Sequence, residues 1–163
     1  MILHYFKKKE NKEQIIATNQ YNKILSDSII FLNDNNFFKD RDYKTSFEIV
    51  SIFLIMFIRI NLLKKNKKKY LKVNDELVSL FIADLDESLR EKGIGDMSIG
   101  KYVKSYVKKF YFRVSNFPKD NNLYINKSFI EYLKITDLIK NDDYINVSRK
   151  FNDKFGDFIK FTN

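Results

Sequence analysis

The sequence predicts an all-α fold, a single-domain bundle of about five to seven helices with a hydrophobic central helix. The 163-residue chain is 44% hydrophobic and holds 16 Phe and 10 Tyr, which is enough apolar material for one core. Four glycines and one proline are too few for the turns of a many-stranded sheet. Apolar residues recur at helical spacing in several segments. We expect one domain over residues 1–163, frayed at residues 1–10.

The first helix is expected over residues 11–34, where Ile15, Ile24 and Leu32 recur at roughly helical intervals. The polar sequence NDNN then favours a helix end, and a break is expected near Asn19. Residues 47–63 form the most hydrophobic run. Because this run is shorter than the about 20 apolar residues that cross a bilayer, we interpret it as the buried central helix. A membrane-contacting helix is the alternative.

A lysine-rich segment follows at residues 64–72, with six lysines and no acidic residue. We expect a solvated loop there, with a contact to phosphates or anionic lipid as the alternative. The next helix is expected to begin at Asn74 as N-cap and to end near Lys92, with Gly93 as a left-handed C-terminal cap.

Another amphipathic helix is expected to follow Asp96 or Ser98 as its cap and to reach Phe117. Its polar face is wholly basic, with Lys101, Lys104, Lys108, Lys109 and Arg113, whereas the preceding helix displays Asp84, Glu87 and Glu91. The two stripes can face each other or be solvated, or the basic stripe can bind RNA. Beyond Pro118, a helix capped by Asn126 or Ser128 and a weaker helix after Tyr144 complete the bundle.

Gly95 to Lys101 reads G-x-x-x-x-G-K, the first part of a nucleotide-binding phosphate loop. That loop needs a preceding strand and a Ser or Thr after the lysine, but here a helical pattern precedes it and Tyr102 follows. The glycines are better explained by a tight helix-to-helix turn. Gly100 lies inside the helix expected after Asp96 or Ser98. Because glycine is unfavourable within a helix, we expect a neighbouring helix or a partner to approach closely there.

The composition excludes most familiar catalytic sites. Cysteine is absent and His4 is the one histidine, which removes cysteine nucleophiles, thiolate zinc sites and Ser-His-Asp arrangements. A single acidic pair, Asp142 and Asp143, is a faint echo of the magnesium motifs of prenyl-chain enzymes, but no second acidic cluster accompanies it. We expect no enzyme activity, no cofactor, no metal and no small-molecule substrate.

The net charge of +9 favours anionic partners such as RNA, ribosomes or lipid headgroups. Only five of the 30 basic residues are arginine, and Asn, Ile, Phe and Tyr are also abundant, so AT-rich codons explain much of the lysine excess. The N-terminal sequence resembles neither a signal peptide nor a mitochondrial transit peptide, so the protein is expected to stay where it is made.

One segment also carries a family resemblance. Residues 80–113 read LFIADLDESLREKGIGDMSIGKYVKSYVKKFYFR, with the pattern F-x-x-D-x-D-x-x-L-R-E-x-G-x-G-D, then G-K, then F-Y-x-R. This resembles the signature of the ubiquinol-cytochrome c chaperone family. The residues in step with that signature are Phe81, Asp84, Asp86, Leu89, Arg90, Glu91, Gly93, Gly95, Asp96, Gly100, Lys101, Phe110, Tyr111 and Arg113.

Upstream, the segment DYKTSFE is similar to the D-T-x-x-G-R-F-E segment of the family and keeps Asp42, Phe47 and Glu48. The chain departs from the family pattern in four places, namely Tyr43, Thr45, Ser46 and Phe112. No useful match extends beyond about residue 118, so the resemblance covers roughly half to two thirds of the chain.

The resemblance implies a non-enzymatic, all-α assembly factor that receives newly made cytochrome b for the cytochrome bc1 complex, near the ribosome and with a small partner protein. The codon bias and the short chain suggest a bacterial-type member, cytoplasmic and peripheral to the inner membrane. We expect partner binding along the helix pair 77–113, at Asp84, Asp86, Arg90, Glu91, Asp96, Lys101, Lys104, Lys108 and Arg113. The alternative function is a basic helical module that binds RNA or the ribosome.

Overall fold

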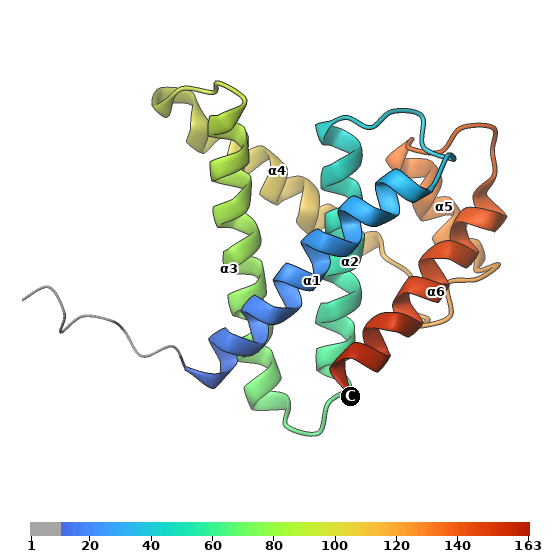
Figure 1. Ribbon diagram of the computed structural model, residues 1–163, viewed down its shortest axis with the longest axis horizontal. Helices are drawn as coiled ribbons and strands as arrows, with labels where there is room; N and C mark the ends of the chain where they lie inside the picture. Colours follow the sequence, from blue (N-terminus) through green and yellow to red (C-terminus); the bar gives the residue numbers. More distant parts are fainter. Residues whose placement is uncertain (1–10) are drawn as a thin grey trace, which may run out of the picture.

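The computed structural model describes residues 11–163, and it contains six helices and no strand in that range, which confirms the all-α prediction (Figure 1). The expected fraying of residues 1–10 lies outside the described residues. The helices are α1 (Lys12–Asp34), α2 (Tyr43–Leu62), α3 (Lys67–Glu91), α4 (Asp96–Asn116), α5 (Lys127–Thr136) and α6 (Tyr144–Thr162).

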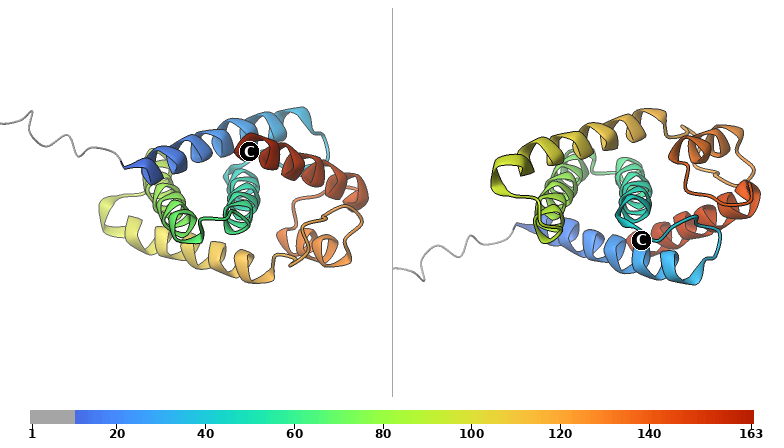
Figure 2. Two further views of the ribbon diagram at one scale, coloured as in Figure 1. Left: turned by 90° about the horizontal axis from the view of Figure 1, so that it is seen from below. Right: turned by 90° about the horizontal axis from the view of Figure 1, so that it is seen from above.

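The helices are arranged around α2. Viewed along α2 and α3, helices α1 and α6 line one side of the molecule, and α4 and α5 line the other (Figure 2). The loops at one end are joined by backbone hydrogen bonds from Lys39 N–H to the Leu138 carbonyl (2.8 Å) and from Lys140 N–H to the Phe37 carbonyl (2.9 Å). These two bonds tie the connection between α1 and α2 to the connection between α5 and α6.

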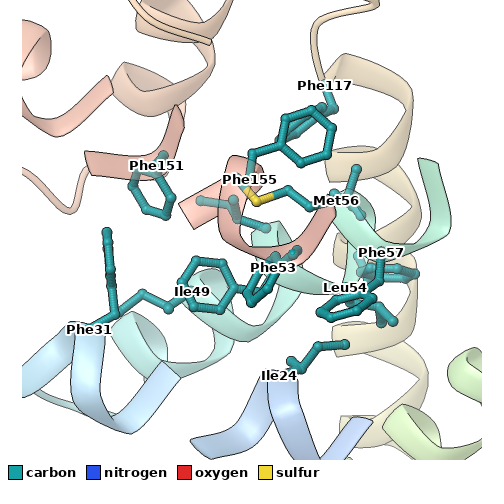
Figure 3. Packing of buried hydrophobic residues seen from close by; sticks show 14 of the residues in the cluster. Ile24, Phe31, Ile49, Phe53, Leu54, Met56, Phe57, Phe117, Phe151 and Phe155 are labelled. Carbon is teal, nitrogen blue, oxygen red and sulfur yellow. The ribbon is translucent and has the colours of Figure 1, made fainter. Parts of the chain in front are cut away.

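Helix α2 is the hydrophobic central helix that the sequence predicted. It is long and apolar enough to cross a membrane, with a mean hydropathy of 1.7, but 72% of that apolar window is buried inside the fold. Phe53 and Phe57 are fully buried in the core (Figure 3). Both rings pack against Phe158 of α6. All six helices contribute to the core cluster that surrounds these side chains. Burial of this apolar surface is the main stabilising contribution to the fold.

A buried amide network fixes the register of α1, α2 and α3. Asn61 exchanges hydrogen bonds with Gln20 (3.0 and 2.9 Å), and its amide group also donates to the Asn74 side chain (2.8 Å). All three residues are less than 8% exposed. Because a buried amide is costly when it is unpaired, this network favours one alignment of the three helices.

Two predictions about helices in the first half of the chain are wrong, namely the break within α1 and the start of α3. Helix α1 is unbroken at Asn19. It begins with a capping box between Asn11 and Gln14, and it packs on both α2 and α3. Helix α3 begins at Lys67 with Asn66 as N-cap, so the lysine-rich segment is a loop only up to Asn66. Asn74 is not a cap; it lies two turns inside α3 and is used for the amide network.

The second half follows the predicted order. Asn126 caps α5 by accepting a hydrogen bond from the Phe129 N–H (3.0 Å), as predicted. The sequence pattern of helix α6 was weak, but the helix is long and well packed against the core. It runs for 19 residues and buries Val147, Phe151, Phe155 and Phe158 at helical spacing against the core.

Candidate functional site

The hairpin between α3 and α4 is closed by backbone geometry. Gly93 has a φ of +88°, a left-handed conformation that favours glycine. Its N–H donates to the Arg90 carbonyl (2.8 Å) and the Ile94 N–H donates to the Leu89 carbonyl (3.2 Å), which together form a Schellman motif. The predicted left-handed cap at Gly93 is therefore confirmed.

The start of α4 differs from the prediction. Gly95 occupies the N-cap position, and Asp96 is the first residue of the helix rather than its cap. The Asp96 carboxylate instead pairs with the Arg90 guanidinium, which also binds Asp86 (2.6 Å). These hydrogen bonds to Asp86 and Asp96 raise the pKa of Arg90. Arg90 therefore ties the end of α3 to the start of α4 on an exposed surface, where such pairs contribute little stability.

Gly100 lies in an open environment. No atom lies within 4 Å of where a Cβ would stand, so the predicted close approach of a neighbouring helix is wrong. The glycine faces the exposed side of α4, beside Lys101. Within the described residues, no packing contact therefore explains this glycine.

An apolar groove lies beside the hairpin, between α1, α2 and α3. Its cavity volume is about 270 Å³. Its walls are Leu25, Ser28, Ile29 and Leu32 from α1, Tyr43, Ser46, Phe47 and Val50 from α2, and Phe81, Asp84, Leu85 and Ser88 from α3. The volume is below the usual range of small-molecule sites, so it suits one or two apolar side chains of a protein partner better.

Among the described residues, Asp84 is the one acidic residue that lines this groove. It accepts a hydrogen bond from the Tyr21 hydroxyl (2.8 Å), and burial together with this carboxylate raises the Tyr21 pKa. The Tyr43 hydroxyl on the α2 wall pairs with the Ser88 hydroxyl on the α3 wall (2.9 Å). The Ser28 hydroxyl is buried and has no hydrogen-bond partner among the described residues. The groove thus combines apolar walls with a few fixed polar groups.

The basic face of α4 divides into two parts. Lys101, Lys104 and Lys108 are exposed, and none of them forms an ion pair with a described residue. Lys109 and Arg113 turn inward instead, and both bind the carboxylate of Glu48 on α2. The basic stripe therefore does not face the acidic stripe of α3.

The sequence placed Arg113 on the exposed face, and the structure places it inside. Its guanidinium donates two hydrogen bonds to Glu48, from Nε (2.9 Å) and from Nη2 (2.7 Å). Glu48 is fully buried and Arg113 is 5% exposed. The geometry is a bidentate pair, because a guanidinium fork matches a carboxylate. We therefore assign Arg113 to the link between α2 and α4 rather than to a contact surface.

Comparison with known families decides what this chain is. The sequence model of the ubiquinol-cytochrome C chaperone family matches residues 40–119, about half of the chain. The chain belongs to this family. None of the curated proteins matches the chain, and none of the solved structures matches it.

The chaperone family signature maps onto one region of the fold. Phe47, Phe81 and Phe110 pack ring against ring between α2, α3 and α4. Asp42 caps α2 through the Thr45 N–H (2.8 Å), and Glu48 binds Arg113. Many signature residues thus hold α2, α3 and α4 together.

The remaining signature side chains reach the surface. Asp86 is half-buried, whereas Arg90, Glu91, Asp96 and Lys101 are exposed around the hairpin. Asp84 lines the groove. The structure therefore brings Asp84 to the groove, gathers the hairpin charges at one end and leaves Lys104 and Lys108 on the outer face of α4.

Sequence reasoning missed the α1 and α2 walls of the groove. Tyr43 and Ser46, two positions at which the chain departs from the family pattern, both line it. A helix pattern reveals which residues are apolar but not which apolar faces remain uncovered after packing. The sequence did contain a signal for the buried ion pair. A carboxylate within an apolar run, such as Glu48, needs a cationic partner, and Arg113 of the same family pattern could supply it.

Proposed function

We propose that this chain is a non-enzymatic assembly chaperone for the ubiquinol–cytochrome c reductase (bc1) complex and that it binds newly made cytochrome b. Membership of the ubiquinol-cytochrome C chaperone family supports the assembly role. Among the described residues, no group of three or more His, Cys, Asp or Glu side chains is arranged to hold a metal ion. The observation that carries the proposal is the apolar groove, whose walls include three residues of the family pattern, Phe47, Phe81 and Asp84.

The groove suits a segment of a membrane protein before assembly. Such segments are rich in apolar side chains that are exposed until they find their final partners. An apolar side chain that enters the groove between Ile29 and Phe81 is removed from water, and the Asp84 carboxylate at the wall selects for a nearby positive or hydrogen-bonding group. This mode of binding needs no chemistry from the chaperone.

The charged hairpin offers a second contact close to the groove. Arg90 and the carboxylates of Asp86 and Asp96 form an exposed network, and Glu91 and Lys101 flank it. Exposed charges of this kind contribute to the rate and specificity of association more than to affinity. We assign this surface to the small partner protein or to a polar segment of cytochrome b.

The proposed location is cytoplasmic and peripheral to the inner membrane, as for a bacterial-type family member. The net charge of +9 supports attraction to the anionic surface at which cytochrome b is inserted. A location at that surface places the chaperone beside its client.

The groove is tested with two neighbouring isoleucines. Ile29 lines the groove and is 63% exposed, whereas Ile30 is 53% exposed and lies outside it. A photo-crosslinking residue at position 29 is expected to capture newly made cytochrome b, and the same residue at position 30 is expected to capture much less. In co-purification without a crosslinking residue, Ile29→Glu is expected to lose newly made cytochrome b and Ile30→Glu to retain it. Equal capture from both positions contradicts the groove assignment.

A second candidate function is binding to RNA or the ribosome through α4. Lys101, Lys104 and Lys108 form an exposed basic row, and the half-exposed rings of Tyr102 and Phe112 flank it. Basic side chains interleaved with aromatic rings are typical of single-stranded RNA sites. Binding of bare RNA that falls steeply with salt and is lost on changing all three lysines to glutamine supports this candidate. Absence of such binding excludes it.

A further inference from the structure

A second surface lies at the end of α3 far from the hairpin, and we call residues 62–72 the basic tip. It comprises the last residue of α2, the connecting turn and the first residues of α3 (Figure 1). Its six lysines are accompanied by no acidic residue and no arginine. None of these lysines forms an ion pair with a described acidic side chain. Lys64 donates hydrogen bonds to the Thr162 carbonyl (2.9 Å) and to the Asn163 side chain (2.7 Å). The tip therefore concentrates positive charge that no described acidic side chain balances.

The same segment exposes large apolar side chains. Leu62 is 47% exposed, Leu63 is 68% exposed and Leu71 is 52% exposed. Farther along α3, Val73 and Leu77 are fully buried. The exposed leucines therefore lie only at this end of α2 and α3. Single exposed leucines are common on proteins, but three among six lysines form a surface that is both apolar and cationic.

The positive charge at the start of α3 is not compensated by neighbouring acidic side chains among the described residues. Lys67, Lys68 and Lys69 stand in the first turn of α3, where the positive end of the helix dipole disfavours cations, and that turn holds no acidic residue. Glu13 of α1 borders the same shallow hollow as Lys68 and Lys72 without forming an ion pair with them. This end of the molecule therefore attracts negative groups from outside it.

We propose that the basic tip docks on a bilayer surface that contains anionic phospholipids. The leucines enter the boundary between headgroups and acyl chains, and the lysines lie among the phosphates. The charge complementarity selects an anionic surface, and the exposed leucines select a bilayer over a nucleic acid. RNA sites favour arginine and free aromatic rings, whereas the tip holds no arginine and its one ring, Tyr70, is half-buried.

This inference deepens the peripheral-membrane part of the proposed function and names the surface that makes the contact. It also has a geometric consequence. The groove residues on α3 begin at Phe81, 14 residues after Lys67, which is about 20 Å along the helix. With the tip on the bilayer and α3 upright, the groove stands above the headgroups and receives segments of the client that lie outside the membrane.

The first experiment measures binding of the full purified chain to vesicles. Vesicles of phosphatidylcholine alone are compared with vesicles that also contain phosphatidylglycerol, by co-sedimentation. We expect binding to the anionic vesicles only. The tip variant Lys65→Gln, Lys68→Gln, Lys72→Gln is expected to bind roughly a hundredfold more weakly.

The matched control removes the same charge elsewhere. The variant Lys101→Gln, Lys104→Gln, Lys108→Gln on α4 has the same net charge as the tip variant and is expected to bind the vesicles like the unchanged protein. Equal weakening by both variants shows attraction by net charge alone and overturns the proposal. Binding of single-stranded RNA through the tip lysines, without vesicle binding, also overturns it.

A fluorescence measurement tests insertion directly. The chain contains no tryptophan, so one introduced tryptophan reports on its own surroundings. Leu63→Trp is expected to shift its emission to shorter wavelength and to be shielded from acrylamide when anionic vesicles are added. Met97→Trp, at the fully exposed start of α4, is expected to show neither change. No shift at position 63 despite vesicle binding overturns the insertion of the tip.

These measurements use purified protein and lipid alone, so they do not depend on cytochrome b. A chain that binds vesicles through the tip but fails to capture cytochrome b retains the docking surface and loses the proposed function. A chain that captures cytochrome b through the groove but does not bind vesicles has the opposite outcome.

Discussion

Glu48 of α2 and Arg113 of α4 form a buried bidentate ion pair, 65 residues apart in the sequence. Lys109, one turn before Arg113, reaches the same carboxylate (2.8 Å). Glu48 and Arg113 both belong to the signature that identifies the family. The pair fixes the position of α4 against the central helix and so contributes to the shape of the hairpin and the groove.

Breaking this pair is expected to be costly. Glu48→Gln leaves the Arg113 guanidinium without a carboxylate in a buried site, and we expect the free energy of unfolding to fall by about 3–5 kcal/mol. Denaturant unfolding measures the change. The control is Glu131→Gln, which breaks the exposed pair with Lys134 and is expected to change stability by less than about 1 kcal/mol.

The double variant separates charge from packing. Glu48→Leu with Arg113→Met removes both buried charges, so it is expected to be more stable than Glu48→Gln alone. A double variant that is less stable than the single variant contradicts this account, because the pair then contributes net stability beyond mutual neutralisation.

Gly93 and Gly100 are expected to respond to alanine with opposite signs. Gly93→Ala places a Cβ on a residue with φ of +88°, so we expect a loss of about 1 kcal/mol. Gly100→Ala adds a methyl group in open space within a helix, so we expect a gain of about 0.5–1 kcal/mol. Thermal unfolding of the two variants checks the signs. A loss of stability at both positions contradicts the open environment of Gly100.

Asp42 makes the stability of α2 dependent on pH. The Thr45 N–H donates to its carboxylate, which lowers the Asp42 pKa below its ordinary value of 3.8. Because the folded pKa is the lower one, ionised Asp42 stabilises the fold above pH 3.8. That contribution is lost as the pH falls through the folded pKa.

The pH dependence is checked by substitution at this cap. Asp42→Ala is expected to lose about 1 kcal/mol at neutral pH, and the difference from the unchanged protein is expected to shrink in strong acid. Asp42→Asn keeps a capping oxygen without a titrating group, so its stability is expected to lack this acid-dependent loss. An Asp42→Ala difference that stays constant into strong acid rules out the titration of Asp42 as the cause.

The sequence predicted the fold where local patterns and packing agree. The apolar run of α2, the cap at Asn126 and the left-handed Gly93 each follow from residue type and position. Prediction failed where a tertiary contact changed the role of a residue. Asn74 resembles a helix cap, yet its amide is needed by Asn61, and the helix begins two turns earlier at Lys67.

The candidate site was predicted only in part. Signature residues located the hairpin, and Asp84, one of the residues predicted to bind a partner, lines a groove that was not foreseen. Arg113 lies inside because the single acid in the apolar run, Glu48, needs a cation. The uncovered face between α1 and α2 depends on how the helices cross, which periodicity does not encode.

Deletion of the gene tests most directly whether this chain assists assembly of the bc1 complex. Immunoblots then follow cytochrome b and cytochrome c1 beside an unrelated membrane complex. We expect a selective loss of the bc1 subunits that the unchanged gene restores and the Ile29→Glu gene does not. Normal levels of cytochrome b and cytochrome c1 in the deletion strain would contradict it.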